Sequence, residues 1–321
     1  MWKTIVRRFL ILIPQLFALS LFVFFLAQFM PGDALRGFIS PGTHPDLIER
    51  LREQHGLNAP WYEQYWRWLN GVIRGDFGNS ITFQRPVTAV IGDRIGNTMF
   101  LSFMASLFTY LIAVPLGIFA ARNKGRPLDK GIMIYTFVAL SIPTVVMGLI
   151  NILIFAFTLG WFPPFGAIEL SAHAAGGWTA FVSRVYHAML PAFTMAILGT
   201  VGIIYFLRSE IIDNDSSDFV TTARSKGVPE GKVYTHHILR NALLPVAGSA
   251  GALIAGIFAG SIFIENVFTF QGMGQLFVSS IRGRDFPVAN VLIMFYAMIG
   301  AIAVLVTDII ITIIDPRIRI K

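Results

Sequence analysis

The chain contains no cysteine. This absence excludes disulfides, zinc–thiolate sites, iron–sulfur clusters and thiol catalysis. Charged residues are also scarce, because Asp, Glu, Lys and Arg make up only 13% of the 321 residues, against ~25% in typical soluble domains. Hydrophobic residues account for 55%. A soluble surface needs more charge than this, so the composition indicates a membrane protein and disfavours a disordered chain or a coiled coil.

Recognised catalytic motifs are missing as well. A phosphate-binding loop needs Gly-x-x-x-x-Gly-Lys followed by Ser or Thr, and the nearest stretch, 227–233, is one residue short and ends in Val. There is no Gly-x-Ser-x-Gly elbow and no His-Glu-x-x-His motif. The adjacent His236 and His237 lack the spacing of a zinc pair. We therefore expect no catalytic residue, no metal and no cofactor in this chain, and no enzymatic activity.

Long apolar runs are what the sequence does contain. A membrane-spanning helix needs ~20 predominantly apolar residues. Six runs meet that requirement, at about 9–30, 98–121, 132–158, 188–207, 243–268 and 288–313. The first run has no small-residue cleavage site, so we interpret it as a retained anchor; a cleaved signal peptide is the weaker alternative. The sequence thus predicts an all-α polytopic membrane protein with six transmembrane helices.

The distribution of basic residues predicts the orientation. With the N-terminus inside, the segments 1–8, 122–131, 208–242 and 314–321 hold 15 Lys and Arg against 7 Asp and Glu, and the opposite side holds 10 of each. Cytoplasmic loops carry the excess of Lys and Arg. Both termini are therefore predicted to be cytoplasmic. The formal charge of +7 is explained by these loops, and we expect no nucleic-acid partner.

The longest external segment is 31–97. We expect short helices at about 45–54 and 60–73. The second helix carries Trp61, Tyr65 and Trp66, which could contact an external ligand, although packing at the membrane surface is favoured because Trp and Tyr collect there. A further external piece, 159–187, predicts a loop with a short helix near 178–186.

Few polar residues fall in or beside the apolar runs. Asp308 lies well inside the sixth run, and such residues are candidates for function, although a structural partner is favoured here. Glu265 and Asn266 end the fifth run and could face the transport pathway or simply the interface. Pro115 and Pro143 are expected to kink the second and third helices. Gly256 and Gly260 form a Gly-x-x-x-Gly pair that is typical of close helix packing.

The most informative stretch is 213–246. Ser217 is one of several N-cap candidates for a helix ending near Lys226. Gly227 can take the left-handed position after that helix, and Pro229 can begin the next one, which ends near Asn241. Two short helices joined by a glycine turn predict a protruding element in a basic cytoplasmic loop rather than a plain linker.

This loop resembles the coupling loop of ABC importer permeases, whose motif is Glu-Ala-Ala, three residues, Gly, and later Ile and Leu-Pro. The corresponding positions here are Thr221, Thr222, Ala223, Gly227, Leu244 and Pro245. Thr replaces the Glu and the first Ala, and the gap before Leu-Pro is longer. In both departures the sequence resembles the oligopeptide/dipeptide branch of that family. HGLNAPWYEQYWRWL, ENVFTFQGMGQLF and DPRIR extend the resemblance along the chain.

The resemblance implies a B-type subunit with the type I ABC importer fold. It divides the chain into 1–30 with the first helix, the external segment 31–97, a five-helix core 98–313 that includes the loop 208–242, and the tail 314–321. The expected location is the plasma (inner) membrane of a prokaryote, in the lipid bilayer.

The resemblance also implies partners. They are a homologous second permease forming a heterodimer, two cytoplasmic ATPases that hold ATP and Mg, and an external binding protein that meets the 31–97 segment. Oligopeptides or dipeptides are the expected cargo. Nickel chelates and glutathione are alternatives within the branch. An ion-coupled secondary transporter is a further alternative, but it would need coupling-ion sites in paired repeats, and no repeat is visible.

Overall fold

A computed structural model gives the fold. It describes residues 2–29, 58–243 and 250–314, together with His44, Asp46, Glu49, Arg50 and Glu53. Within these ranges the chain is helical, and the one extended pairing is an isolated bridge between Asn79 and Pro86. Four helices are long and apolar enough to cross a membrane, and a bent pair would make a fifth crossing. The four are α1 (Trp2–Phe29), α4 (Val87–Arg122), α8 (Gly177–Asp215) and α16 (Phe286–Ile314).

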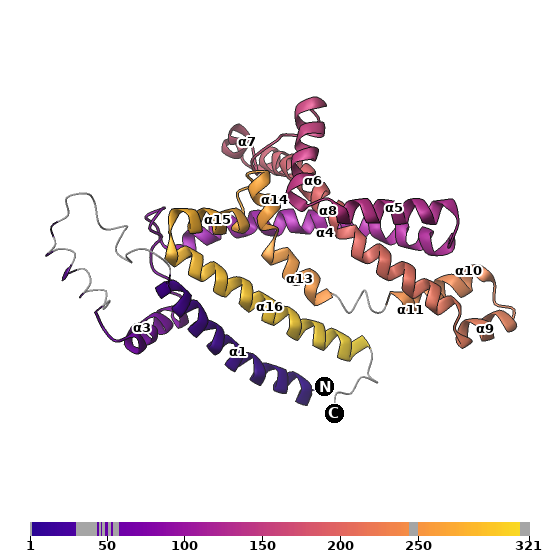
Figure 1. Cartoon of the computed structure of the whole chain (residues 1–321), viewed down its shortest axis with the longest axis horizontal. Helices are drawn as coiled ribbons and strands as arrows, with labels where there is room; N and C mark the ends of the chain where they lie inside the picture. The colour runs from indigo at the N-terminus through magenta and orange to yellow at the C-terminus, as the bar shows by residue number, and fades with distance from the viewer. Residues whose placement is uncertain are drawn as a thin grey trace.

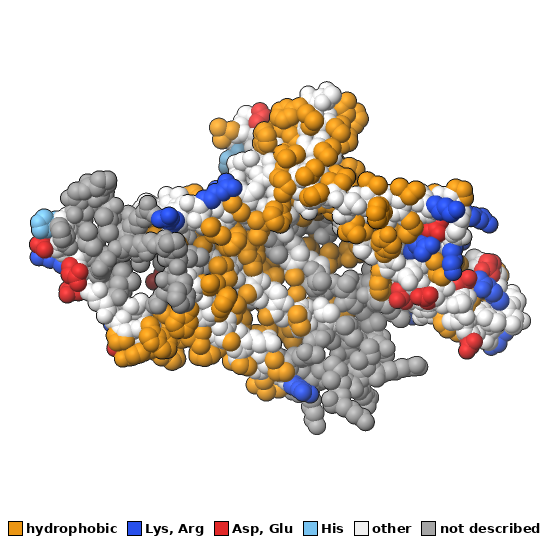
Figure 2. All heavy atoms as spheres, viewed as in Figure 1, with side chains coloured by type: hydrophobic (Ala, Val, Ile, Leu, Met, Phe, Trp, Pro, Cys, Tyr) orange, Lys and Arg blue, Asp and Glu red, His pale blue; other side chains and the backbone are white. Residues whose placement is uncertain are grey.

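The surface agrees with this assignment. Figure 2 shows hydrophobic side chains spread over the flanks of the long helices, with charged side chains gathered near the two ends of the molecule. Leu111, Phe137 and Leu140 are among the large apolar side chains left exposed. Apolar patches of this extent are unusual on soluble monomers, and lipid is the environment that covers them. The prediction of an all-α polytopic membrane protein is confirmed.

The third predicted span is not one continuous helix. It divides into α5 (Pro127–Ser141) and α6 (Thr144–Asn151), which continues as the π-helix η1 (Ile152–Thr158), and the two halves meet at 104°. The break follows from Pro143, because the residue before a proline is driven out of the helical region. Ile142 accordingly has φ −91° and ψ 121°. Pro115, by contrast, lies inside α4 without ending it.

The fourth and fifth predicted spans also differ from expectation. α8 begins at Gly177, directly after the short helix α7 (Leu170–Ala175), so the predicted separate helix near 178–186 is the first part of α8. The fifth span is divided between α13 (Ala250–Ala259) and α14 (Ile262–Val267). Gly260 has φ +65° at this break. Residues 244–249 of that span lie outside the described ranges.

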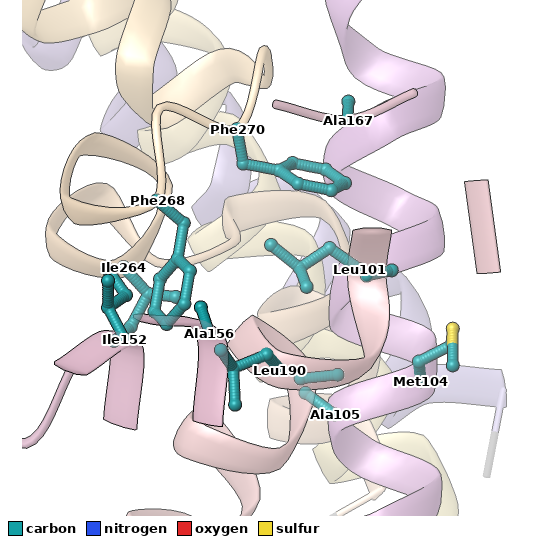
Figure 3. Packing of buried hydrophobic residues seen from close by; sticks show 12 residues of the cluster. Leu101, Met104, Ala105, Ile152, Ala156, Ala167, Leu190, Ile264, Phe268 and Phe270 are labelled. Carbon is teal, nitrogen blue, oxygen red and sulfur yellow. The ribbon is translucent and has the colours of Figure 1, made fainter. Parts of the chain in front are cut away.

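A cluster of buried apolar residues joins these elements. Figure 3 shows Leu101 of α4, Leu190 of α8 and Ile264 of α14 meeting Phe268 and Phe270, which follow α14 in the chain. All five side chains are almost fully buried. Close packing of these side chains adds dispersion contacts that are individually small and collectively large. The cluster therefore holds the broken helices against the two continuous ones.

Asp285 connects the loop after α3 to the junction between α15 (Met273–Gly283) and α16. Its buried carboxylate accepts hydrogen bonds from the Ser80 hydroxyl and from the N–H groups of Ile81 and Thr82. In Figure 1, α1 and α16 lie side by side, so that the start of α1 is near the end of α16.

The predicted helix at 60–73 is α3 (Trp61–Ile73), whereas the one predicted at 45–54 lies largely outside the described residues. Tyr65 fixes α3 to α1. Its side chain is only 4% exposed, its hydroxyl lies 2.8 Å from Ser20 Oγ, and its ring centroid lies 5.4 Å from that of Phe24. Tyr65 is therefore not available to an external protein, which corrects the sequence interpretation. Trp61 and Trp66 remain exposed.

We predict that Tyr65→Ala releases α3 from α1. Removing a buried aromatic ring costs about 3–5 kcal/mol in protein cores, and the Ser20 hydroxyl would lose a buried partner. Hydrogen exchange of the α3 amides in detergent should accelerate strongly. Trp66→Ala is the matched control, because Trp66 is 62% exposed, and it should leave the exchange unchanged. Equal exchange in the two variants would contradict the packing role of Tyr65.

Candidate functional site

A helix–turn–helix element follows α8, and we call residues 216–243 the knob. It contains α9 (Asp218–Ser225), α10 (Glu230–Lys232), the π-helix η2 (Val233–Leu239) and α11 (Arg240–Ala242). Figure 1 shows it projecting beyond the end of α8. The order predicted from the sequence is confirmed. Ser217 is the N-cap residue in extended conformation, although its hydroxyl donates back to the Asn214 carbonyl at 2.6 Å instead of capping α9.

The turn of the knob depends on Gly227. Its φ is +71°, in the left-handed region that glycine adopts without strain. Its N–H donates to the Arg224 carbonyl at 2.9 Å, and the N–H of Val228 donates to the Ala223 carbonyl at 3.2 Å. A Cβ atom built on Gly227 would meet no atom of the described chain within 4 Å. The turn is therefore an exposed tip, where the backbone and not the available space requires glycine.

The inner face of the knob packs on the rest of the chain. Val220 and Ala223 of α9 are buried together with Val233 and Ile238 of η2. The same cluster includes Leu207 and Ile211 of α8 and Ala121 of α4. Residues three apart on a helix share one face, which explains the pairing of Val220 with Ala223. Ala223, one of the motif residues expected to couple to an ATPase, thus lies on the inner face of α9, and its coupling role stays a prediction.

The outer face carries the other motif residues of α9. Thr221 and Thr222 are exposed, and their hydroxyls donate to the carbonyls of Ser217 and Asp218, at 3.3 and 2.8 Å. Both side chains are thus tied to their own helix. Leu244 and Pro245, the distal part of the motif, lie outside the described residues. Among the motif residues that the structure describes, the exposed ones are therefore Thr221, Thr222 and Gly227 at the turn.

Arg224 connects three segments of the knob. Its guanidinium lies 2.7 Å from an Asp215 carboxylate oxygen at the end of α8 and 2.6 Å from a Glu230 carboxylate oxygen at the start of α10. These hydrogen bonds raise the pKa of Arg224, with Glu230 making the larger contribution, and they lower the pKa of Glu230. Isolated exposed ion pairs contribute little stability. The planar guanidinium instead fixes the relative positions of α8, α9 and α10, because residues of all three helices meet at this group.

Two contacts tie the base of the knob to neighbouring helices. The Arg122 guanidinium at the end of α4 lies 4.3 Å from the centre of the Tyr234 ring in η2, a cation–π arrangement. Arg208 of α8 donates to both carboxylate oxygens of Asp129 in α5, at 2.7 and 2.8 Å. Asp129 is buried and also accepts from the N–H of Gly125 at 2.8 Å. Movement of the knob must therefore displace α4, α5 and α8.

None of these base contacts was singled out from the sequence. A signal was present, because Asp129 is the one acid in the basic stretch 122–131 and Arg208 directly follows an apolar run. Their pairing could not be read from the chain, since 79 residues separate them. Only the parallel placement of α4 and α8, with α5 returning beside them, brings the two side chains together.

Two of the remaining sequence candidates, Glu265 and Asn266, belong to α14, away from the knob. Glu265 is fully buried and accepts hydrogen bonds from the Thr98 hydroxyl at 2.9 Å and from the N–H groups of Gly274 and Gln275, at 2.7 and 3.1 Å. The Thr98 oxygen in turn accepts from the N–H of Met273 at 2.7 Å. We call this network the Glu265 hub. It fastens the turn between α14 and α15 to α4.

Asn266 and Asp308 complete the set. The Asn266 amide donates to the Ile262 carbonyl at 2.7 Å, a bond within its own helix. Asp308 lies in α16, but its side chain is outside the described ones. No group of three or more His, Asp or Glu side chains that could hold a metal occurs in the described part of the chain.

Comparisons with known proteins agree with this architecture. The family described as "Binding-protein-dependent transport system inner membrane component" matches residues 113–320, and its N-terminal companion, "Binding-prot-dependent transport system membrane comp, N-term", matches residues 1–102. A solved structure titled "Inward facing conformations of the MetNI methionine ABC transporter" shares the fold with a TM-score of 0.56. That alignment covers 71% of this chain and 97% of the other at 13% identity.

Curated relatives match over the full length. The oligopeptide transport system permease protein AppB of Bacillus subtilis is 36% identical over 316 residues, which cover 98% of each chain. The glutathione transport system permease protein GsiC of Escherichia coli is 33% identical over 321 residues and 100% of each chain. These matches confirm the resemblance to ABC importer permeases. The chain belongs to the family of binding-protein-dependent transport system inner membrane components.

Proposed function

We propose that this chain forms half of the translocation pathway of an ATP-driven peptide importer and couples to a separate ATPase through the knob. One relative is named for oligopeptides, which supports this cargo, and another is named for glutathione, which supports the alternative cargo. Nickel chelates are the remaining alternative cargo within the branch. Membership of a binding-protein-dependent family disfavours the ion-coupled alternative.

The observation that carries the coupling role is the rigid, exposed Gly227 turn. An exposed tip can seat in a cleft of another subunit, and the Arg224 bridges keep it fixed relative to α8. Displacement of the tip would reach α4 through the Arg122–Tyr234 contact and α5 through the Asp129–Arg208 pair. Packed helices transmit such displacements as rigid-body movements.

The partners follow from this assignment. Two ATPase subunits would hold ATP and Mg on the cytoplasmic side and meet the knobs of this chain and of a homologous second permease. An external binding protein would deliver the peptide to the opposite side, where Trp61 and Trp66 are exposed. The excess of Lys and Arg in the knob and in 122–131 supports a cytoplasmic placement of that end. The chain itself would hydrolyse no ATP.

The direct test of the function is transport by the whole complex in proteoliposomes. With binding protein outside and ATP inside, the wild-type complex should accumulate peptides from a panel, and the same peptides should stimulate its ATPase activity. Accumulation driven by an ion gradient without ATP would contradict the proposal. Accumulation of nickel chelates but no peptide would reject the cargo class while leaving the transporter class intact.

We predict that Gly227→Asp uncouples the permease from the ATPase. The residue is exposed, so the chain should insert normally, but a side chain at positive φ adds about 1–2 kcal/mol of strain and the new carboxylate alters the tip. Co-purification of the ATPase or ATP-dependent uptake should fall at least several-fold at equal membrane abundance.

Two variants control for strain and charge. Gly75→Asp makes the same change at another exposed glycine with positive φ, +76°, in the external loop after α3. Lys124→Ala changes the other basic loop. Both should keep ATPase binding within about twofold of wild type. Normal ATPase binding and uptake by Gly227→Asp would show that the turn is not the coupling element.

A second prediction concerns orientation. Asn79 and Ser225 are exposed at opposite ends of the described molecule. Because the chain has no cysteine of its own, Asn79→Cys and Ser225→Cys each introduce one unique thiol. A membrane-impermeant maleimide added to intact cells should label the first, and the second should react only after the membrane is opened. Labelling of both from the same side would refute the proposed topology.

A further inference from the structure

A cavity of about 330 Å³ lies between α4, α8 and α13 and is open to the surface, because Gly199 and Gly256 in its lining are exposed. It is at the lower end of the range of ligand pockets, about 300–1,000 Å³. Its polar lining comes from one helix: Ser102, Ser106, Thr109 and Tyr110 of α4. These positions follow each other at the spacing of one helical face. α8 contributes Gly199, and α13 contributes Gly256.

The chemistry of this lining is specific. It contains hydroxyl groups and no Asp, Glu, Lys, Arg or His. The Ser102 side chain is 2% exposed, and its hydroxyl has no hydrogen-bond partner within the described part of the chain. This hydroxyl is closed off from the cavity, whereas the half-buried side chains of Ser106 and Tyr110 lie at its surface. Hydroxyls both donate and accept hydrogen bonds.

The glycines determine the shape of the cavity. Gly256 and Gly260 were expected to pack closely as a Gly-x-x-x-Gly pair, and only Gly260 does so. A Cβ atom on Gly260 would approach Thr98 Cγ2 to 2.5 Å and Glu265 Oε1 to 2.6 Å. A Cβ atom on Gly256 would meet no described atom within 4 Å. Gly256 therefore leaves open space in the wall of the cavity.

The cavity also has a defined place along the helices. Thr98 of the Glu265 hub lies one helical turn before Ser102 on α4, and Gly260 both lines the cavity and touches the hub. The hub thus borders the cavity at one end. In the other direction, α4 and α8 lead to the base of the knob. The cavity lies between the Glu265 hub and the element proposed to contact the ATPase.

We propose that this cavity binds the main chain of the transported peptide, an inference that rests on the proposed function. Each peptide bond presents one N–H donor and one C=O acceptor whatever its side chain. Hydroxyls can pair with both groups, and a lining without charge selects for neither terminus. The permease would therefore bind peptides of different sequence in the same way. Discrimination between peptide side chains would take place outside this cavity.

The first test narrows the cavity by substitution. In the complete complex, Gly256→Leu should reduce peptide uptake at least tenfold without changing complex recovery, because the side chain enters open space. Gly300→Leu is the matched control: Gly300 lies in α16, away from the cavity, and a Cβ atom there also meets nothing within 4 Å. It should keep uptake within about twofold. Ser106→Ala should raise the KM for peptide several-fold.

The second test uses thiol labelling of Gly256→Cys and Gly300→Cys in the complete complex. A saturating tripeptide delivered with ATP should slow maleimide modification at position 256, and not at position 300. Peptides with blocked termini should protect equally well, because the lining carries no charge. Protection only by peptides with free termini would overturn the main-chain assignment.

The outcomes separate this inference from the proposed function. If the wild-type complex transports no peptide, the proposed function fails first. If the wild type transports peptide and Gly256→Leu does so equally well, or if position 256 is not protected, the cavity assignment alone is wrong. If Gly256→Leu prevents assembly with the second permease, this face is a packing surface and the inference is also overturned.

Discussion

The contact between α4 and α8 supports the rest of the described structure. The two helices run in the same direction, so that Leu101 meets Leu190 in the apolar cluster near one end, and Gly117 meets Leu207 near the other. A Cβ atom on Gly117 would lie 3.2 Å from Leu207, and one on Gly199 would lie 2.9 Å from Thr109 Oγ1. Without a hydrophobic driving force between helices in lipid, such close approach of small residues is what stabilises helix pairs.

Buried acidic residues fix the other elements to this pair. Asp129 holds α5 to α8, and Glu265 holds the α14–α15 turn to α4. Asp285 holds the loop after α3 to the start of α16. Each carboxylate receives at least two hydrogen bonds, which offset the cost of burying a charge. These three residues determine where the broken helices stand, because a different arrangement would leave a buried carboxylate without donors.

The same helix pair connects the cavity with the knob. Thr109 and Gly199 meet at the cavity, and Ala121 and Leu207 meet at the base of the knob. A displacement of the knob therefore cannot be confined to its tip. It is expected to act on the hydroxyl-bearing face of α4, which lies across the cavity from α13, whose break at Gly260 has a positive φ. We infer a physical route by which an event at the Gly227 turn would change the shape of the cavity proposed to bind peptide.

Much of the fold could be predicted because it depends on local properties. Apolar length identifies helices such as α1, α4 and α16, and the Gly227–Pro229 spacing identifies the turn of the knob, since both features act within a few residues along the chain. The break at Pro143 also has a local cause. The sequence predicted a kink there, and the structure has a break between two helices. The membrane class and the helix–turn–helix order are thus properties of the sequence itself.

The roles of individual side chains needed the tertiary structure. Tyr65 and Trp66 are adjacent aromatic residues, yet one is buried on α1 and the other is exposed. Ala223 belongs to the coupling motif but packs inward, and Gly256 resembles a packing glycine but lines open space. The sequence determined which segments are helices and which of them enter the membrane. Only the tertiary structure decided which face of each helix is buried, because burial depends on neighbours that are distant in the chain.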